Sequence, residues 1–116
     1  MLRTNLKHLE SPEETRKVLE NEENVMISCG RMGPMCIPVY AIMEQLEAEY
    51  SHVHFYDQDF DGPAAGFIQR LPECASFMGL PFDVFFKNGK AVAATTSIQN
   101  KEQVTAILDR EFGSPA

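Results

Sequence analysis

The order of strand-like and helix-like segments constrains the fold of this chain more than any other feature. Short apolar runs alternate with amphipathic stretches, and Asn88-Gly89, a strong hairpin signal, separates the last two runs. The expected strands span residues 5–9, 25–29, 53–56, 82–87 and 90–95, and the expected helices span 12–20, 37–50, 67–77 and 101–112. The alternation requires parallel crossovers, and the hairpin adds an antiparallel edge. The sequence therefore predicts an α/β fold, a central mixed five-stranded sheet with helices on both faces.

Two helix starts carry a local signal of their own. Ser11 is expected to cap the first helix, with Glu14 completing a capping box. Asn100 and Gln103 form the same pattern ahead of the last helix.

Length and charge narrow the classes of protein. A chain of 116 residues is expected to be one domain, 1–116. The net charge of −7 argues against binding to nucleic acid or to an anionic membrane surface. No apolar stretch of signal-peptide or membrane-spanning length follows the N-terminus, so we expect a cytoplasmic protein.

Two cysteines frame a glycine-containing loop, Cys29-Gly-Arg-Met-Gly-Pro-Met-Cys36, between the second strand and the second helix. Pro38 fits only the first turn of a helix, so Cys36 falls in that turn or just before it. A helix N-terminus carries about half a positive charge and free N–H donors, which favour a thiolate. Three cysteines in a reducing compartment indicate a redox, catalytic or metal role, or burial as small apolar residues.

The cysteine loop has two interpretations. In the first, Cys29 and Cys36 form a reversible disulfide across a loop that Gly30 and Gly33 make pliable, and Arg31 helps to lower a thiolate pKa. At least one of the two thiols would then have a pKa below the free-cysteine value of about 8.5. In the second, Cys29 is a buried strand residue and Cys36 an unused thiol.

Three segments in this order resemble thioredoxins. The stretch 36–50 is similar to the active-site helix of that family, with Cys36 at the second cysteine of its Cys-Gly-Pro-Cys motif. Gly79-Leu80-Pro81 is similar to the Gly-Ile-Pro whose proline is cis and faces the cysteines, and 85–90 is similar to the closing hairpin. The resemblance implies a thioredoxin-like domain, a cis Leu80–Pro81 bond and thiol–disulfide exchange.

The chain also departs from that family at the site. The first cysteine of the motif falls on Gly33, and Cys29 stands where the family usually has an aromatic residue. The buried carboxylate that assists proton transfer falls on Ile27. The chain has no tryptophan, and several extra residues precede Gly79.

Which thiol attacks stays open. By order in the family motif, Cys29 would attack and Cys36 resolve, whereas the helix position favours Cys36. The resemblance implies that the backbone of Leu80 pairs with a bound target chain. The residues expected to contact a target are Met32, Gly33, Pro34, Met35, Leu80 and Pro81.

The remaining candidates point to structure. Cys74 is expected on the third helix as a structural residue, with a regulatory thiol as the alternative. We expect no metal site, because His52 and His54 form a solvated pair and the acidic segment 57–61 is a loop without calcium-site spacing.

The expected function is thiol–disulfide exchange through Cys29 and Cys36, which would make the protein a thiol–disulfide oxidoreductase without an organic cofactor. Its partners would be proteins with disulfides and a recycling reductase. The alternatives are a thioredoxin-fold module that binds a partner without turnover, and a redox sensor.

Overall fold

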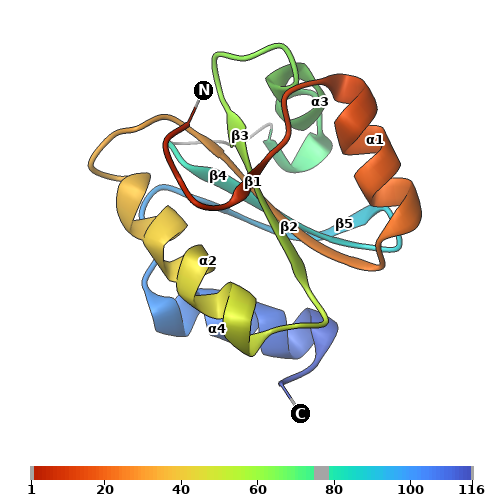
Figure 1. The fold of residues 1–116 in the computed structure, drawn as a ribbon, viewed down its shortest axis with the longest axis vertical. Helices are drawn as coiled ribbons and strands as arrows, with labels where there is room; N and C mark the ends of the chain where they lie inside the picture. Colours follow the sequence, from red (N-terminus) through yellow and green to blue (C-terminus); the bar gives the residue numbers. More distant parts are fainter. Residues whose placement is uncertain (1, 75–78, 116) are drawn as a thin grey trace.

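The computed structural model describes residues 2–74 and 79–115, which form one five-stranded sheet flanked by helices (Figure 1). The strands are β1 (Lys7–His8), β2 (Asn24–Gly30), β3 (His54–Asp59), β4 (Phe82–Lys87) and β5 (Lys90–Thr96). The helices are α1 (Pro12–Asn21), α2 (Ile37–Glu49), α3 (Ala65–Gln69) and α4 (Lys101–Phe112), with a 3-10 turn, η1, at Pro72–Cys74. The predicted α/β architecture is confirmed.

The sheet has the order β1-β3-β2-β4-β5, with β2 at its centre. β2 runs parallel to β3 and antiparallel to β4, so the sheet is mixed as predicted. The β4–β5 hairpin turns at Asn88 and Gly89, whose φ angles of 51° and 81° are the positive values that a tight hairpin turn needs. The Leu80–Pro81 peptide bond is cis, which confirms the prediction.

Two apolar clusters cover the two faces of the sheet. Helices α2 and α4 lie on one face, and α1 and α3 lie on the other (Figure 1). Successive side chains of a strand point to opposite faces. Along β2, Met26 therefore belongs to the α2/α4 cluster, whereas Val25, Ile27 and Cys29 belong to the α1/α3 cluster.

One strand is longer than predicted. β3 continues through Asp57 to Asp59, although the acidic segment was expected to be a loop. Parallel pairing with β2 as far as Gly30 holds this backbone in the sheet. The buried carboxylate of Asp57 is satisfied by the hydroxyl of Thr4 and by Nδ1 of His8, at 2.5 Å.

The third helix is shorter than predicted. α3 begins at Ala65 and ends at Gln69, and the chain forms η1 from Pro72, where an interruption was expected. Residues 75–77 of the predicted helix lie outside the described residues.

Both predicted caps are present. Asn100 and Gln103 form the complete capping box, with bonds of 2.8 and 2.9 Å. Ser11 Oγ accepts the N–H of Glu14 at 3.1 Å, but the carboxylate of Glu14 accepts the N–H of Glu10, one residue before the cap. None of the described helices is long and apolar enough to cross a membrane.

Candidate functional site

Cys36 lies at the N-cap of α2, where the predicted helix start places it. Its side chain is 2% exposed, and Sγ accepts the backbone N–H of Arg31 at 3.4 Å. The loop between β2 and α2 closes on the carbonyl of Gly33, which accepts the N–H groups of Cys36 and Ile37 at 3.1 and 3.0 Å. The sulfur is therefore held under a short, tightly turned loop at the positive end of the helix.

The sulfur of Cys36 meets a hydroxyl and a proline at Gly30. A Cβ atom added to Gly30 would lie 2.6 Å from Oη of Tyr40, 2.9 Å from Sγ of Cys36 and 3.1 Å from Cβ of Pro81. Contacts under 3.0 Å are not tolerated by packed atoms, so only glycine fits at this position. Residues from β2, α2 and the segment before β4 thus converge on one point.

Tyr40 supplies the second polar atom of this site. It is almost fully buried, and its hydroxyl donates to the carbonyl of Arg31 at 3.1 Å. Burial raises the pKa of Tyr40, and the neighbouring Cys36 raises it further. The phenol therefore stays protonated, as a neutral donor beside the sulfur of Cys36.

Cys29 lies on the opposite face of the sheet from Cys36. It is fully buried in the α1/α3 cluster, and β2 pairs it with Gln58 of β3 and Phe82 of β4. Burial raises the pKa of Cys29 to about 12, which is the opposite of the lowered pKa expected for an attacking thiol. The assignment of Cys29 as the attacking thiol, one of the two alternatives left open by the sequence, is therefore not supported by its surroundings.

All three cysteines are free thiols, and the structure does not bring Cys29 and Cys36 together. A bond between them would require the end of β2 to leave its two partner strands. The Cys29–Cys36 disulfide stays a prediction that oxidation of the protein will test.

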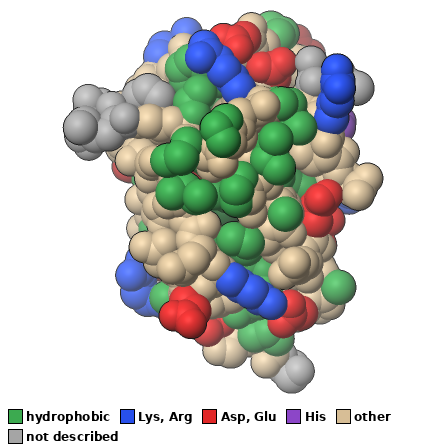
Figure 2. Space-filling view, turned by 90° about the vertical axis from the view of Figure 1, so that its left-hand side faces the viewer, with side chains coloured by type: hydrophobic (Ala, Val, Ile, Leu, Met, Phe, Trp, Pro, Cys, Tyr) green, Lys and Arg blue, Asp and Glu red, His purple; other side chains and the backbone are tan. Residues whose placement is uncertain are grey.

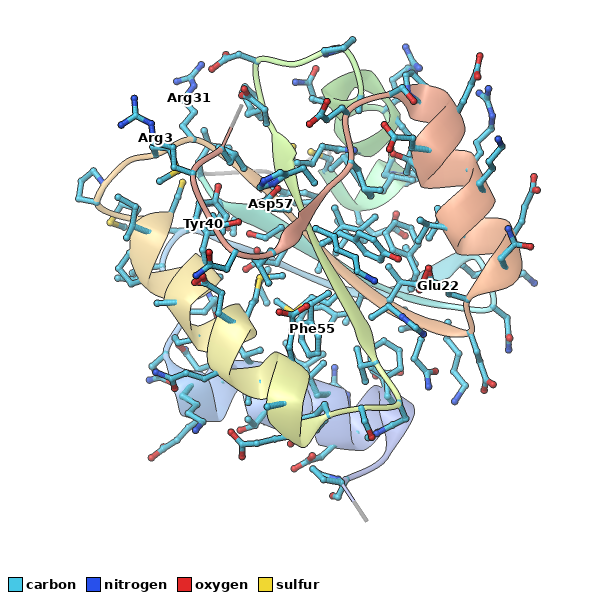
Figure 3. All side chains as sticks on the ribbon, viewed as in Figure 1. Arg3, Glu22, Arg31, Tyr40, Phe55 and Asp57 are labelled. Atoms are coloured by element: carbon cyan, nitrogen blue, oxygen red, sulfur yellow. The ribbon has the colours of Figure 1, made fainter. Side chains whose placement is uncertain are left out.

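The side chain of Arg31 is directed away from the sulfur. Its guanidinium binds the carboxylate of Asp61 through Nε and Nη2, at 2.8 and 2.9 Å, and lies over the ring of Phe60. Figure 3 shows Arg31 at the outer edge of the molecule and Tyr40 closer to the sheet. Arg31 contacts Cys36 through its backbone N–H. The sequence predicted an effect of the charged side chain instead.

The loop over Cys36 presents an apolar surface. Apolar side chains gather on the face that carries the N-terminal end of α2 (Figure 2), and Met32, Met35 and Ile37 are 40–46% exposed. We call these three side chains the loop surface. Gly33, where the family has its first cysteine, has open space on its side-chain side. Of the other predicted contact residues, Pro34 is exposed, Leu80 is half-buried and Pro81 is buried.

Sequence reasoning missed Asp83 on β4. Its neighbours Phe82 and Val84 point to the α1/α3 face, so Asp83 points to the face of Cys36. It follows Pro81 by two residues, and its register partner Ser28 precedes Gly30 by two, so its backbone lies about 6.5 Å along the strand from that of Pro81. A single carboxylate inside the apolar run Phe82–Lys87 was the signal in the sequence.

The surroundings of Asp83 leave its carboxyl only partly satisfied. Oδ2 accepts the hydroxyl of Thr95 at 3.1 Å, and the hydroxyl of Ser28 lies close enough to lower the pKa. Neither Oδ1 nor Oγ of Ser28 reaches ordinary hydrogen-bond geometry with another described residue. Complete burial outweighs both hydroxyls and raises the pKa of Asp83 to about 7.

No group of three or more histidine, cysteine or acidic side chains among the described residues could hold a metal ion. His54 instead binds the carboxylate of Glu22 at 2.8 Å, and His52 contacts the carbonyl of Gly113 at 2.8 Å. Cys74 ends η1 and packs against the α1/α3 cluster.

The fold is similar to that of solved thioredoxins, and no family model and no curated protein matches the sequence. Chlamydomonas reinhardtii thioredoxin f2 superposes with a TM-score of 0.78 and 16% identity, over 94% of this chain and 98% of that chain. Plasmodium falciparum thioredoxin superposes with a TM-score of 0.76 and 18% identity, over 91% of this chain and 99% of that chain. For Arabidopsis thaliana thioredoxin O2, the TM-score is 0.75 and the identity 18%, over 96% of this chain and 97% of that chain. The thioredoxin fold is therefore shown, and the chemistry must be argued from the residues.

Proposed function

We propose that this protein exchanges thiols and disulfides with extended protein segments, and that Cys36 is its reacting thiol. The convergence of Sγ of Cys36, Oη of Tyr40 and Pro81 around Gly30 carries the proposal. The N–H of Arg31 already contacts the sulfur, and the N-terminus of α2 favours negative charge there. These groups stabilise a thiolate without the side-chain charge of Arg31.

The reaction begins with a thiolate at Cys36. The thiolate attacks one sulfur of a target disulfide, the target S–S bond breaks, and the second target sulfur leaves as a thiolate that takes up a proton. An external thiol, supplied by a small molecule or a recycling reductase, then attacks the mixed disulfide and releases Cys36. The fully buried position of Cys29 supports an external resolving thiol.

Asp83 is the proposed acceptor for the proton of Cys36. It lies on the same face, its pKa of about 7 suits proton exchange at neutral pH, and Oδ1 has no hydrogen-bond partner among the described residues. Because Asp83 and Cys36 form no direct hydrogen bond among the described residues, the proposed transfer passes through a bridging group such as water. Asp83 thus takes the role of the buried carboxylate that thioredoxins have at the position of Ile27.

The loop surface and Pro81 are proposed to hold the target segment. Met32, Met35 and Ile37 are exposed apolar side chains beside the buried sulfur, and methionine adapts to varied partner shapes. A reducing compartment such as the cytoplasm fits three free thiols, one of them in the core.

The test is the reaction of each single-cysteine-to-serine variant with a peptide that contains one disulfide, with glutathione as the external thiol. Cys36→Ser should reduce turnover to the background rate, because serine cannot form the mixed disulfide. Cys74→Ser, the matched control, should keep turnover within about twofold, since its cysteine lies on the far face. Retained turnover in Cys36→Ser would contradict the proposal.

Binding without turnover is the second candidate function. One observation favours it: Cys36 is 2% exposed, whereas the residues of the loop surface are 40–46% exposed. The same peptide with both cysteines replaced by serine separates the two functions. A binder without exchange chemistry should hold this serine peptide as tightly as the disulfide peptide. The disulfide peptide should then leave Cys36 unmodified.

A further inference from the structure

Cys29 and Cys74 share one apolar cluster. Cys29 is fully buried near the end of β2, and Cys74, at the end of η1, is partly exposed and packs against the same cluster. The 3-10 turn that carries Cys74 contacts β5, whose Thr96 pairs with Phe82, and Phe82 in turn pairs with Cys29. Two thiols that are 45 positions apart in the sequence thus belong to one apolar cluster.

Cys74 influences the pKa of Cys29 more than Cys36 does. After burial, the charge of Cys74 is the largest influence on the pKa of Cys29, ahead of Asp59 and Asp83. Cys36 has the smallest influence of this group, although it is only seven positions away. Cys74 therefore acts on Cys29 from the same apolar cluster, on the same face of the sheet.

We propose that Cys29 and Cys74 form a disulfide when the protein meets an oxidant, so that the α1/α3 face carries a redox-sensitive modification site. The site is separate from the thiol proposed for exchange, and it does not depend on the proposed function. It gives the third cysteine a chemical role and uses the thiol that the exchange reaction leaves out.

The oxidant reaches Cys74 first because Cys29 has no exposed surface. With a small disulfide such as glutathione disulfide, the thiolate of Cys74 attacks one sulfur, and one glutathione thiolate leaves. Cys29 then attacks the sulfur of Cys74 and displaces the second glutathione as a thiolate, which takes up the proton that Cys29 loses. The protein loses two electrons, and one glutathione disulfide becomes two thiols. Burial raises the pKa of both cysteines, so the bond should form faster as the pH rises.

The bond would link the 3-10 turn η1, which comes before Pro81 in the sequence, to the central strand. Cys74 precedes Gly79-Leu80-Pro81 by only a few residues, whereas Cys29 sits in the central strand. Oxidation would thus tie Cys74 to the centre of the sheet.

Peptide mapping tests the proposal directly, because trypsin separates the three cysteines. Cleavage after Arg31 and Arg70 puts Cys29, Cys36 and Cys74 on three different peptides. The folded protein is treated with glutathione disulfide, free thiols are alkylated, and the digest is analysed without reduction. We expect the peptide of Cys29 linked to that of Cys74, with Cys36 outside this bond.

The controls make each outcome decisive. Cys36→Ser should form the same bond, Cys74→Ser should leave Cys29 reduced, and Cys29→Ser should stop at a glutathione adduct on Cys74. Oxidation in urea should scramble the pairing, which would show that the fold directs the bond. A Cys29–Cys36 bond in the folded wild type, or an adduct on Cys74 that never proceeds to a bond, would overturn the proposal.

Discussion

The two faces of the sheet give the same side chain two different environments. On the α2/α4 face, Cys36 has an N–H on its sulfur, a phenol beside it and a carboxyl on the neighbouring strand. On the α1/α3 face, Cys29 is surrounded by apolar side chains, and burial raises its pKa to about 12. Proximity in the sequence therefore says little about shared chemistry. The alternation of β2 places the two thiols on opposite faces of the sheet, although only six residues separate them in the sequence.

The largest expected effect concerns the carboxyl that sets the α2/α4 face apart. Asp83 has a pKa of about 7 in the folded protein against a usual value of 3.8. Between these values the folded protein holds a proton that the unfolded chain has lost. The contribution of Asp83 to the free energy of unfolding should therefore be complete below about pH 4. The free energy of unfolding should fall, by on the order of a few kcal/mol, as the pH rises to 7.

Asp83→Asn isolates this contribution. Unfolding by urea between pH 4 and 8 should give a flatter profile in the variant, because asparagine does not ionise. The buried Asp57, whose pKa burial also raises, contributes a slope of the same sign in both proteins. Equal slopes in the two proteins would mean that Asp83 is ionised in the folded state.

The next effect tests the close packing around Cys36. In Gly30→Ala, the added methyl would meet Tyr40, Cys36 and Pro81 at 2.6–3.1 Å, and we expect a loss of about 1–3 kcal/mol in unfolding free energy. Gly33→Ala is the matched control, because its methyl enters open space and should change the stability by less than about 0.5 kcal/mol. Urea unfolding of both variants measures the difference. Equal stabilities would show that the three groups do not converge on Gly30.

The elements with local signals could be predicted from the sequence, and the site could be predicted only in part. Asn88-Gly89 and the Asn100 cap act within a few residues, so their structures follow from the sequence alone. The sequence predicts the third strand only as far as Tyr56, because the acidic end of β3 is held by non-local pairing with β2. That pairing depends on residues about 30 positions away, which no local pattern describes.

The separation of Cys29 from the site around Gly30 could be predicted from the alternation of side chains along a strand. Val25, Ile27 and Cys29 alternate with Met26 and Ser28, so the alternation alone separates Cys29 from Gly30. The face that α2 covers, however, depends on the path of the crossover, and the contact between Cys36 and Gly30 is visible only in three dimensions. Asp83 was missed for the same reason, since its relation to Pro81 matters only once β4 lies beside β2.

The smallest expected effect concerns the loop that separates the two cysteines. Arg31 contacts Cys36 through its backbone N–H, while its guanidinium binds Asp61 in an exposed pair. Arg31→Ala keeps the N–H and removes the charge. Because exposed ion pairs contribute about 0–1 kcal/mol, we expect a stability loss within that range. The rate at which Cys36 reacts with the disulfide peptide should change by less than about threefold, since solvent and salt screen an exposed charge and the direct N–H contact remains.

Asp61→Asn is the matched control, because it breaks the same ion pair and leaves the positive charge free to approach the sulfur. If the guanidinium tunes Cys36, as the sequence suggested, Arg31→Ala should slow the reaction at least tenfold and Asp61→Asn should accelerate it. If the backbone contact is what matters, both variants should react like the wild type across pH 6–9. The second outcome would place the control of Cys36 in the fold of the loop, where a substitution at Gly30 disturbs it and a change of surface charge does not.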